Sequence, residues 1–525
     1  MSVNNSEHKG IILLKKGQKG LIHAVFSRFG LFALLLIAQF VALFSIFQWL
    51  GEFLPQIWGG SVILTSIMVL YLINTRLDPS AKITWLIIIL LLPIFGSLLF
   101  FYTQSDFGHH ALVIRLNHLI AHARNSIPQS EETREHFAAD CPDALPLANY
   151  IHRTGCFPIY DHCDVTYFPS GEAKFEELLR QLERAEHFIF LEYFIVDEGE
   201  MWGQVLEILA RKAKQGVEVR VMYDGTCEFM LLPRDYPKRL HQLGIQCKVF
   251  APVTPFVSTH YNYRDHRKIL VIDGHTAFTG GINLADEYIN RVTRHGHWKD
   301  TAIMVQGEAT KSFTLLFLQL WNISGKDLDF ERFLSVPIPQ HNAPGYVIPY
   351  GDYPLDNDKV GERVYMDLLN RARHYVHIMT PYLILDSTME TAIKFAAERG
   401  VEVVLILPGI PDKKAPYALA KTHYASLLAS GVHIFEYTPG FVHAKVFVSD
   451  DREAVVGTIN LDYRSLYHHF ECAAYLNGTS CIPDIEADFQ ATLAQCRPVT
   501  TETIRHEAWH TRILGWLLKG IAPLL

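Results

Sequence analysis

Two stretches of the chain carry one pattern: His266-Arg-Lys-Ile-Leu-Val-Ile-Asp-Gly274 and His443-Ala-Lys-Val-Phe-Val-Ser-Asp450. Each reads H-x-K-x4-D. Successive residues of a strand point to opposite faces, so the His and Lys of each copy share one face while the apolar residues between them pack on the other. The Asp has the opposite parity and ends the strand, which predicts that Asp273 and Asp450 anchor turns.

The surrounding sequence is duplicated as well. Apolar strand patterns alternate with helical patterns, which is typical of an α/β fold. The strand that begins GVEV at Gly216 recurs at Gly400, an offset of 184 residues, and His266 recurs at His443, an offset of 177 residues. Two markers with nearly the same offset predict a repeated unit of about 180 residues.

Paired His and Lys residues suit phosphodiester chemistry. An imidazole with a pKa near about 6.5 can attack phosphorus or donate a proton at neutral pH, and a lysine supplies positive charge to the phosphoryl oxygens. Two facing pairs would therefore clamp a phosphodiester, with one His as nucleophile and the other as acid, and Lys268 and Lys445 as phosphate binders. No metal ion or other cofactor is required by this arrangement.

Further residues recur at fixed distances from each His. A small residue follows 15 positions later and an Asn follows 17 positions later. Because small residues permit close approach of a ligand and amides can bind phosphoryl oxygens, we expect a phosphate-binding role for four residues. They are Gly281, Asn283, Thr458 and Asn460.

Three apolar stretches precede this region: Leu31–Leu50, Ile57–Ile73 and Ile83–Phe101. The first and third are long enough to cross a bilayer as helices, and the second can borrow residues from the turn before it. The sequence therefore predicts a membrane anchor with two to three transmembrane helices. Lysines and arginines before the first stretch favour a cytoplasmic N-terminus. The number of full crossings stays open, and so does the side on which the rest of the chain lies.

The composition limits other functions. The formal net charge of -8 argues against a nucleic-acid partner. The eight cysteines form no C-x-x-C pair, so we expect reduced thiols and no zinc site. Adjacent histidines, among them His468 and His469, are interpreted as surface or structural residues. The C-terminal run Ile504–Leu518 predicts an amphipathic helix that either lies at a membrane interface or closes the core.

The two motifs resemble the signature of the phospholipase D superfamily. The resemblance implies an α/β class with two duplicated α/β/α sandwich domains, each with a central mixed sheet, whose motifs form one active site. It also implies that His266 forms a phosphohistidine, that His443 is the acid and base, and that a carboxylate lies behind each His. Glu471 fits the second half, and Asp300 is favoured over Glu287 in the first.

Longer stretches resemble bacterial cardiolipin synthases, among them Asp78–Gly96, Tyr263–Tyr288 and Gly457–Cys472. This implies transfer of a phosphatidyl group between two phosphatidylglycerol molecules, giving cardiolipin and glycerol. The alternative is a hydrolytic phospholipase D or another phosphatidyltransferase. We expect a multi-pass protein of the bacterial plasma membrane, with membrane lipids as partners and homo-oligomerisation left open. The expected domains are residues 1–105 (anchor), 106–345 (first unit) and 346–525 (second unit with the C-terminal amphipathic helix).

Overall fold

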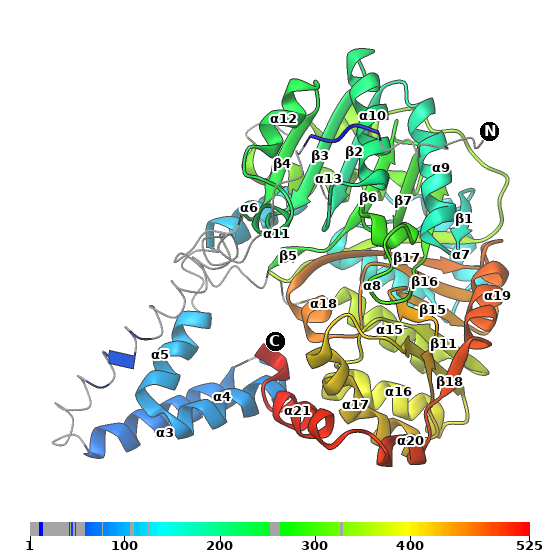
Figure 1. Cartoon of the computed structure of the whole chain (residues 1–525). Coiled ribbons are helices and arrows are strands. Elements are labelled where there is room, and N and C mark those ends of the chain that lie inside the picture. The colour runs from blue at the N-terminus through cyan, green and yellow to red at the C-terminus, as the bar shows by residue number, and fades with distance from the viewer. Residues whose placement is uncertain are drawn as a thin grey trace, which may run out of the picture.

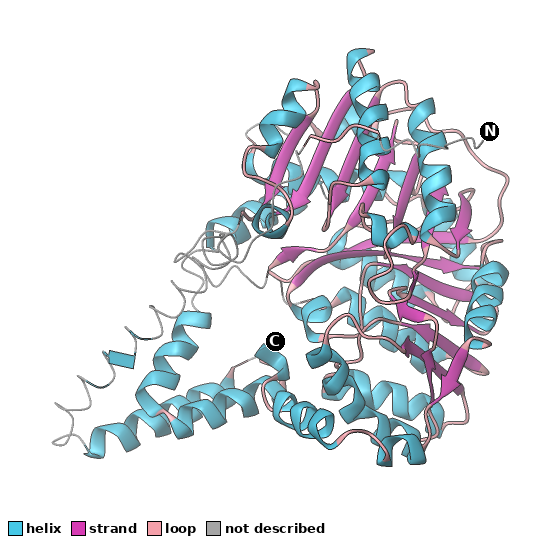
Figure 2. Cartoon of the chain, in the orientation of Figure 1, coloured by secondary structure: helices cyan, strands magenta, loops and turns pink. Residues whose placement is uncertain are grey.

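A computed structural model describes residues 10–13, 41, 44, 45, 48, 58–75, 77–104, 110–123, 126–252, 263–325, 329–356 and 358–524. Two mixed β-sheets dominate it (Figures 1 and 2). Their strand orders are β1-β9-β7-β6-β2-β3-β4 and β10-β17-β16-β15-β11-β12-β13-β18. The first seven positions correspond one to one, with parallel pairing in β2-β3-β4 and in β11-β12-β13. The predicted duplication and the mixed α/β class are therefore confirmed.

The elements of the first half occupy residues 164–334. Its strands are β1 (Asp164–Phe168), β2 (Phe188–Tyr193), β3 (Glu218–Asp224), β4 (Gln246–Phe250), β5 (Arg264–Asp265), β6 (Lys268–Ile272), β7 (Thr276–Gly280), β8 (His297–Lys299) and β9 (Ala302–Gln306). Its helices are α9 (Gly171–Arg184), α10 (Glu200–Lys214), α11 (Gly225–Met230), α12 (Tyr236–Gln242), α13 (Thr310–Trp321) and α14 (Phe330–Leu334).

The second half repeats this plan. Its strands are β10 (Tyr346–Asp352), β11 (Tyr375–Met379), β12 (Glu402–Pro408), β13 (His433–Tyr437), β14 (Gly440–Val442), β15 (Val446–Ser449), β16 (Glu453–Gly457), β17 (His469–Asn477) and β18 (Cys496–Pro498). Its helices are α15 (Val360–Arg371), α16 (Ser387–Glu398), α17 (Lys414–Ala429), α18 (Tyr463–Tyr467), α19 (Ile482–Leu493), α20 (Thr501–Arg505) and α21 (Trp509–Lys519).

Both faces of the first sheet are covered by helices, as the alternation of strand residues requires. On β2, Ile189 and Leu191 join the core beneath α9 and α10, whereas Phe188 and Phe190 join the core around α13. Helix α13 also contacts β10 and so lies between the two halves. The core around α13 continues through the second sheet, and one apolar interior therefore holds both halves together.

The halves exchange two short strands at their boundary. Strand β5 of the first half pairs in parallel with β17 of the second, and β14 of the second pairs in parallel with β8 of the first. Strands β5 and β14 lead directly into the two H-x-K motifs. Each motif is consequently positioned by backbone hydrogen bonds to the opposite half.

Two helices of the predicted first unit, α7 (Glu131–Asp140) and α8 (Leu145–Gly155), pack against the second sheet. Helix α8 contacts β10 and α15. The Tyr346 hydroxyl donates to the Asp140 carboxylate at 2.7 Å. The backbone of Tyr160 forms an isolated antiparallel β-bridge with that of Val347. Helices α7 and α8 precede β1 in the chain, and they thus cover β10, the edge strand of the second sheet, rather than the sheet of the first half.

The N-terminal region contains α3 (Trp58–Asn74), α4 (Pro79–Leu91), α5 (Pro93–Gln104) and α6 (His110–Ala123). Among the helices described, none combines the length and apolar character needed to cross a membrane. The stretch Leu31–Leu50 lies almost entirely outside the described residues. The stretch Ile83–Phe101 was expected as one helix, and that expectation is wrong. It divides at Pro93, whose ring cannot continue a helix, and α5 packs back on α4.

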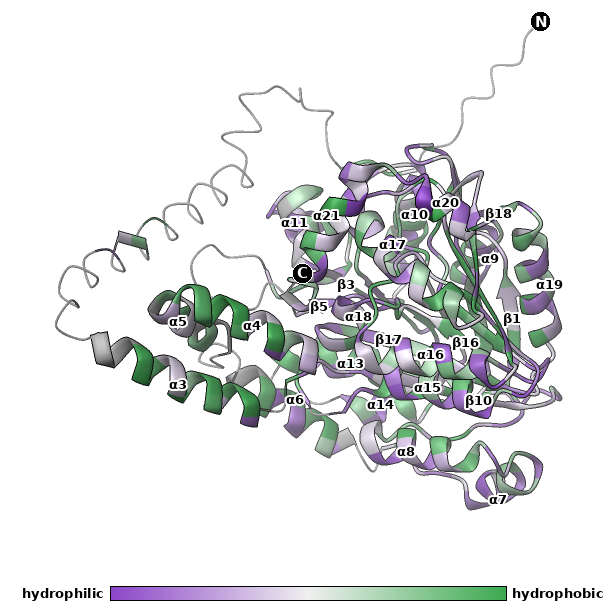
Figure 3. Ribbon diagram, turned by 90° about the horizontal axis from the view of Figure 1, so that it is seen from below, coloured by the Kyte–Doolittle hydropathy of each residue, from purple (hydrophilic) through white to green (hydrophobic). Residues whose placement is uncertain are grey.

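These helices carry apolar side chains on their outside. Met68, Trp85 and Phe100 form part of a small internal core, while Ile63, Leu70, Leu91 and other residues of α3–α5 face outward. Figure 3 shows hydrophobic residues along α3, α4 and α5. Helix α21 lies close by, because the Thr84 hydroxyl of α4 donates to the Gly520 carbonyl at 2.8 Å. On α21, Trp509 and Trp516 are 73% and 75% exposed.

Candidate active site

The two predicted histidines meet carboxylates from opposite halves. His266 Nδ1 lies 2.9 and 3.0 Å from the two carboxylate oxygens of Glu471, and His443 Nδ1 lies 2.7 Å from Asp300 Oδ2. All four side chains are buried. Because each carboxylate occupies Nδ1, it orients the ring and directs Nε2 toward the remaining space. The sequence suggested these two carboxylates, and the structure shows that each serves the histidine of the other half.

The exchanged strands explain this crossing. The His266 amide donates to the Phe470 carbonyl at 2.9 Å, immediately before Glu471 on β17. The His443 amide donates to the Lys299 carbonyl at 2.7 Å, immediately before Asp300. Each histidine is thus fixed beside its carboxylate by the backbone of the opposite half, and neither half contains a complete pair.

Burial sets the ionisation of the two imidazoles. It lowers the pKa of His443 to about 4, helped by the charge on Lys445 and opposed by Asp300. It also lowers the pKa of His266 well below its ordinary value, although Glu471 opposes the shift. Burial alone would raise the pKa of Glu471, but contact with His266 holds it below its ordinary value. Burial thus favours the uncharged form of both rings, and a neutral Nε2 is a nucleophile or a base.

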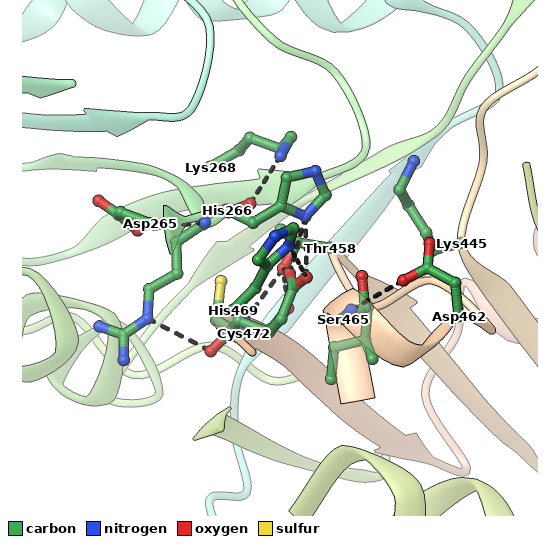
Figure 4. Close-up of polar contacts among 12 residues, drawn as sticks. Asp265, His266, Lys268, Lys445, Thr458, Asp462, Ser465, His469 and Cys472 are labelled. Carbon is green, nitrogen blue, oxygen red and sulfur yellow. Dashed lines mark hydrogen bonds and ion pairs between the residues drawn. The ribbon is translucent and has the colours of Figure 1, made fainter. Parts of the chain in front are cut away.

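The two lysines lie in the same space. Figure 4 shows Lys268 and Lys445 to either side of His266. Lys268 Nζ donates to the His266 carbonyl at 2.6 Å, and Lys445 Nζ lies 3.0 Å from His443 Nδ1. Burial lowers the pKa of Lys268 to about 8 and that of Lys445 to about 7, and charge on Lys268 contributes to the shift at Lys445. Two buried ammonium groups this close favour a bound anion.

Asp273 and Asp450 anchor turns, as their parity predicted. The carboxylate of Asp273 accepts from the amides of Glu186, His187 and Phe188, each at 2.7 Å. Asp450 accepts in the same way from residues 373–375, at 2.7 to 2.9 Å. Both have positive φ, 51° and 53°. They fix the starts of β2 and β11 and do not contact the imidazoles.

The four residues expected at the phosphate have other neighbours. The Asn283 side chain accepts from the Ile195 amide and donates to the Tyr288 hydroxyl. The Thr458 hydroxyl donates to Glu471, and a Cβ on Gly281 would lie 2.0 Å from Asp300 Oδ1. Thr458 and Gly281 thus adjoin the two carboxylates, whereas Asn283 contacts neither. Within the described residues, Oδ1 of buried Asn460 has no hydrogen-bond partner. That these four residues contact a bound phosphate stays a prediction.

One residue beside the site was not assigned to it from the sequence. His469 was assigned to the surface or to a structural role, yet it is buried and its ring centroid lies 5.3 Å from that of His266. The signal was present, because a residue two before Glu471 on a strand faces the same side. His266, His469 and Glu471 also form the one described group with the spacing of metal ligands, their ligand atoms lying within 4.8 Å of one another.

Comparison with known proteins agrees with this geometry. The family described as "Cardiolipin synthase, PLD-like domain" matches residues 178–321 and 365–493, and the family described as "Phospholipase_D-nuclease N-terminal" matches residues 63–103. The cardiolipin synthase of Geobacillus sp. (strain WCH70) is 33% identical, covering 91% of this chain and 95% of its own. A Streptococcus mutans protein without an assigned function is 56% identical, covering 87% and 99% respectively.

A solved structure shares the fold. Phosphatidylserine synthase of Haemophilus influenzae superposes with a TM-score of 0.54 at 16% identity, over 69% of this chain and 93% of its own. Two H-x-K pairs in one duplicated site define a phospholipase D-like phosphatidyltransferase, an enzyme of phospholipid metabolism. Within that class, the chain belongs to the cardiolipin synthase family.

Proposed function

We propose that this enzyme joins two phosphatidylglycerol molecules into cardiolipin and glycerol through a phosphohistidine on His266. The observation that carries the proposal is the pair of buried, carboxylate-bound imidazoles beside two buried lysines. The relatedness to cardiolipin synthases supports the choice of lipid. The reaction exchanges one phosphodiester for another, so it consumes no ATP.

In the first step, Nε2 of His266 attacks the phosphorus of one phosphatidylglycerol. The N–P bond forms, the bond from phosphorus to the glycerol oxygen breaks, and His443 supplies a proton to the leaving oxygen. His443 must be protonated for this step. A bound phosphodiester anion raises the pKa of a neighbouring imidazole, and Asp300 at 2.7 Å also stabilises the imidazolium.

In the second step, a glycerol hydroxyl of the other phosphatidylglycerol attacks the phosphorus. Neutral His443 takes the proton of that hydroxyl, the new P–O bond forms, and the N–P bond to His266 breaks. Lys268 and Lys445 stabilise the nonbridging oxygens through both steps. Glu471 keeps the proton on Nδ1 of His266, so that Nε2 is free to attack and to leave.

We further propose that the enzyme works at the bacterial plasma membrane as a multi-pass protein. The outward apolar residues of α3–α5 and the exposed tryptophans of α21 support this location. Anchoring the site beside the bilayer raises the effective concentration of lipid substrates that stay in it.

The product of purified enzyme with phosphatidylglycerol in mixed micelles tests the proposal. We expect cardiolipin and glycerol in equal amounts by mass spectrometry, and their loss in His266→Ala and His443→Ala. Phosphatidic acid without cardiolipin would instead identify the alternative, a hydrolytic phospholipase D with water as acceptor. A His266→Ala variant of full activity would refute the phosphohistidine.

A further inference from the structure

Each carboxylate that holds an imidazole has an aromatic ring two residues before it. Trp298 precedes Asp300, and His469 precedes Glu471. Residues two apart on extended backbone face the same side. The ring centroid of Trp298 lies 5.3 Å from that of His443, and the centroid of His469 lies 5.3 Å from that of His266. The duplication therefore places one ring beside each imidazole, at equal distance.

The two rings have different surroundings. Trp298 packs between Tyr288 and Phe441, with centroids at 4.9 and 4.8 Å, and belongs to an apolar wall around His443. His469 is 8% exposed, and neither of its ring nitrogens has a hydrogen-bond partner in the described part of the chain. Buried polar atoms are normally paired. An unpaired imidazole facing the nucleophile therefore indicates a ligand that pairs it.

The neighbours of His469 define that ligand. One of its ring nitrogens lies within 4.8 Å of a ring nitrogen of His266 and of a Glu471 oxygen. Glu471 already accepts from His266 and from the Thr458 hydroxyl, and its Oε1 is 3.6 Å from His469 Nδ1, beyond a hydrogen bond. The N–H of His469 is thus available to an acceptor on His266. Lys268 Nζ donates to the His266 carbonyl at 2.6 Å, so its positive charge lies beside His266 and favours an anionic acceptor there.

We propose that His469 donates a hydrogen bond to a nonbridging oxygen of the phosphoryl group while that group is bonded to His266. The inference rests on the proposed phosphohistidine and assigns His469 as a further catalytic residue. Its proton is not transferred. The N–P bond forms, the P–O bond to glycerol breaks, and the proton from His443 goes to the glycerol oxygen. Trp298 occupies the equivalent place beside His443, and its Nε1 is likewise a buried donor without a hydrogen-bond partner among the described residues.

The experiment measures the phosphatidyl-enzyme directly. Full-length enzyme in mixed micelles is mixed with phosphatidylglycerol labelled in its phosphate, quenched in base, and its bound label is followed in a single turnover. His469→Phe keeps the ring and removes the donor, and we expect labelling to slow about 10- to 100-fold. His469→Gln restores a donor, and its rate is expected to return to within about 5-fold of wild type. The melting temperature of His469→Phe should stay close to that of wild type, because the ring packing is kept and only the 3.6 Å contact of Nδ1 with Glu471 is lost.

His468→Phe is the matched control, since it makes the same change one residue earlier, and its labelling rate should stay within about 2-fold of wild type. The inference is overturned if His469→Phe labels at the wild-type rate, or if His469→Gln is no faster than His469→Phe. His266→Ala separates this failure from that of the proposed function. A variant lacking the His266 imidazole that still acquires label refutes the nucleophile, and the inference with it.

Discussion

Glu471 and Asp300 each act on a histidine that the other half of the chain contributes. This arrangement makes the site a property of both halves, because a half alone would hold an imidazole without its carboxylate. The carboxylates hold the proton on Nδ1 and leave Nε2 available, so their loss should affect the chemical step more than lipid binding. The same contact occurs away from the site, between His377 Nδ1 and Glu486 at 2.9 Å, and provides a comparison.

We expect Glu471→Gln and Asp300→Asn to lower kcat by about 100- to 10,000-fold, with a much smaller change in KM. The amide keeps the shape of the carboxylate but neither fixes the Nδ1–H tautomer nor stabilises an imidazolium. Steady-state formation of cardiolipin measures the effect. Glu486→Gln is the control, and its kcat should match wild type. Equal losses in all three variants would mean that the effect is structural.

The lysines make a prediction about pH. Burial lowers the pKa of Lys445 to about 7 and that of Lys268 to about 8. A lysine loses its positive charge as pH rises through its pKa, so the free enzyme should lose affinity for the phosphodiester above these values. We expect kcat/KM to fall with rising pH, with midpoints between about 7 and 8. The fall in kcat should come at higher pH, because bound phosphate favours the charged ammonium. A kcat/KM that stays flat to about pH 9.5 would contradict this.

At the scale of elements, the sequence was informative where one strand decides the geometry. The turn-anchoring position of the terminal Asp follows from period-two alternation, and Asp273 and Asp450 directly after β6 and β15 confirm it, whereas His266, His443 and Lys445 lie just before these strands. The choice of Asp300 over Glu287 also agrees with the contact to His443. The alternation of side chains along one strand cannot predict which distant strands pair with each other. Strands β5, β8 and β14 have two or three residues each and no pattern of their own, so the exchange between halves was not predictable.

Apolar length was the less reliable signal. The run Ile83–Phe101 contains Pro93, and the proline divides it into α4 and α5, although hydropathy alone treats it as one span. His469 was not assigned to the site for a related reason, since its residue type was considered without its strand position. The supporting contacts of Asn283 and Thr458 depend on neighbours far away in sequence, and no local pattern reports them.

The turn anchors give a prediction about stability. Asp273 is 5% exposed and accepts three backbone N–H groups, which Asp273→Ala would leave unpaired, that of Phe188 buried and those of Glu186 and His187 half-buried. We expect the free energy of unfolding to fall by about 2 to 4 kcal/mol. Asp450→Ala removes the same three bonds at a more exposed site and should cost less, because water can reach the freed amides. Denaturant unfolding followed by circular dichroism compares the two, and an equal or reversed order would count against this explanation.

At the scale of the whole molecule, the C-terminal helix extends the apolar surface of the N-terminal helices. Gly515 of α21 packs so closely on α17 that a Cβ would lie 2.3 Å from the Ala418 carbonyl, and Trp509 and Trp516 face outward. The contact from Thr84 to Gly520 joins this helix to α4. Helix α21 would then set the distance and tilt of the second half relative to the bilayer. A role in orientation predicts an effect that depends on the kind of lipid aggregate.

We therefore expect Trp509→Ser combined with Trp516→Ser to lower cardiolipin formation about 5- to 50-fold in phosphatidylglycerol bilayer vesicles. In detergent micelles, where substrate reaches the site from any direction, activity should stay within about 2-fold of wild type. Tryptophan side chains prefer the headgroup region, so serine at both positions removes the contact while leaving the packing through Gly515. Met230→Ser is the control, because Met230 is 74% exposed on α11 of the first half. Equal activity of the double variant and wild type in vesicles would exclude α21 as a membrane contact, and an equal loss in micelles would instead place its role in folding of the second half.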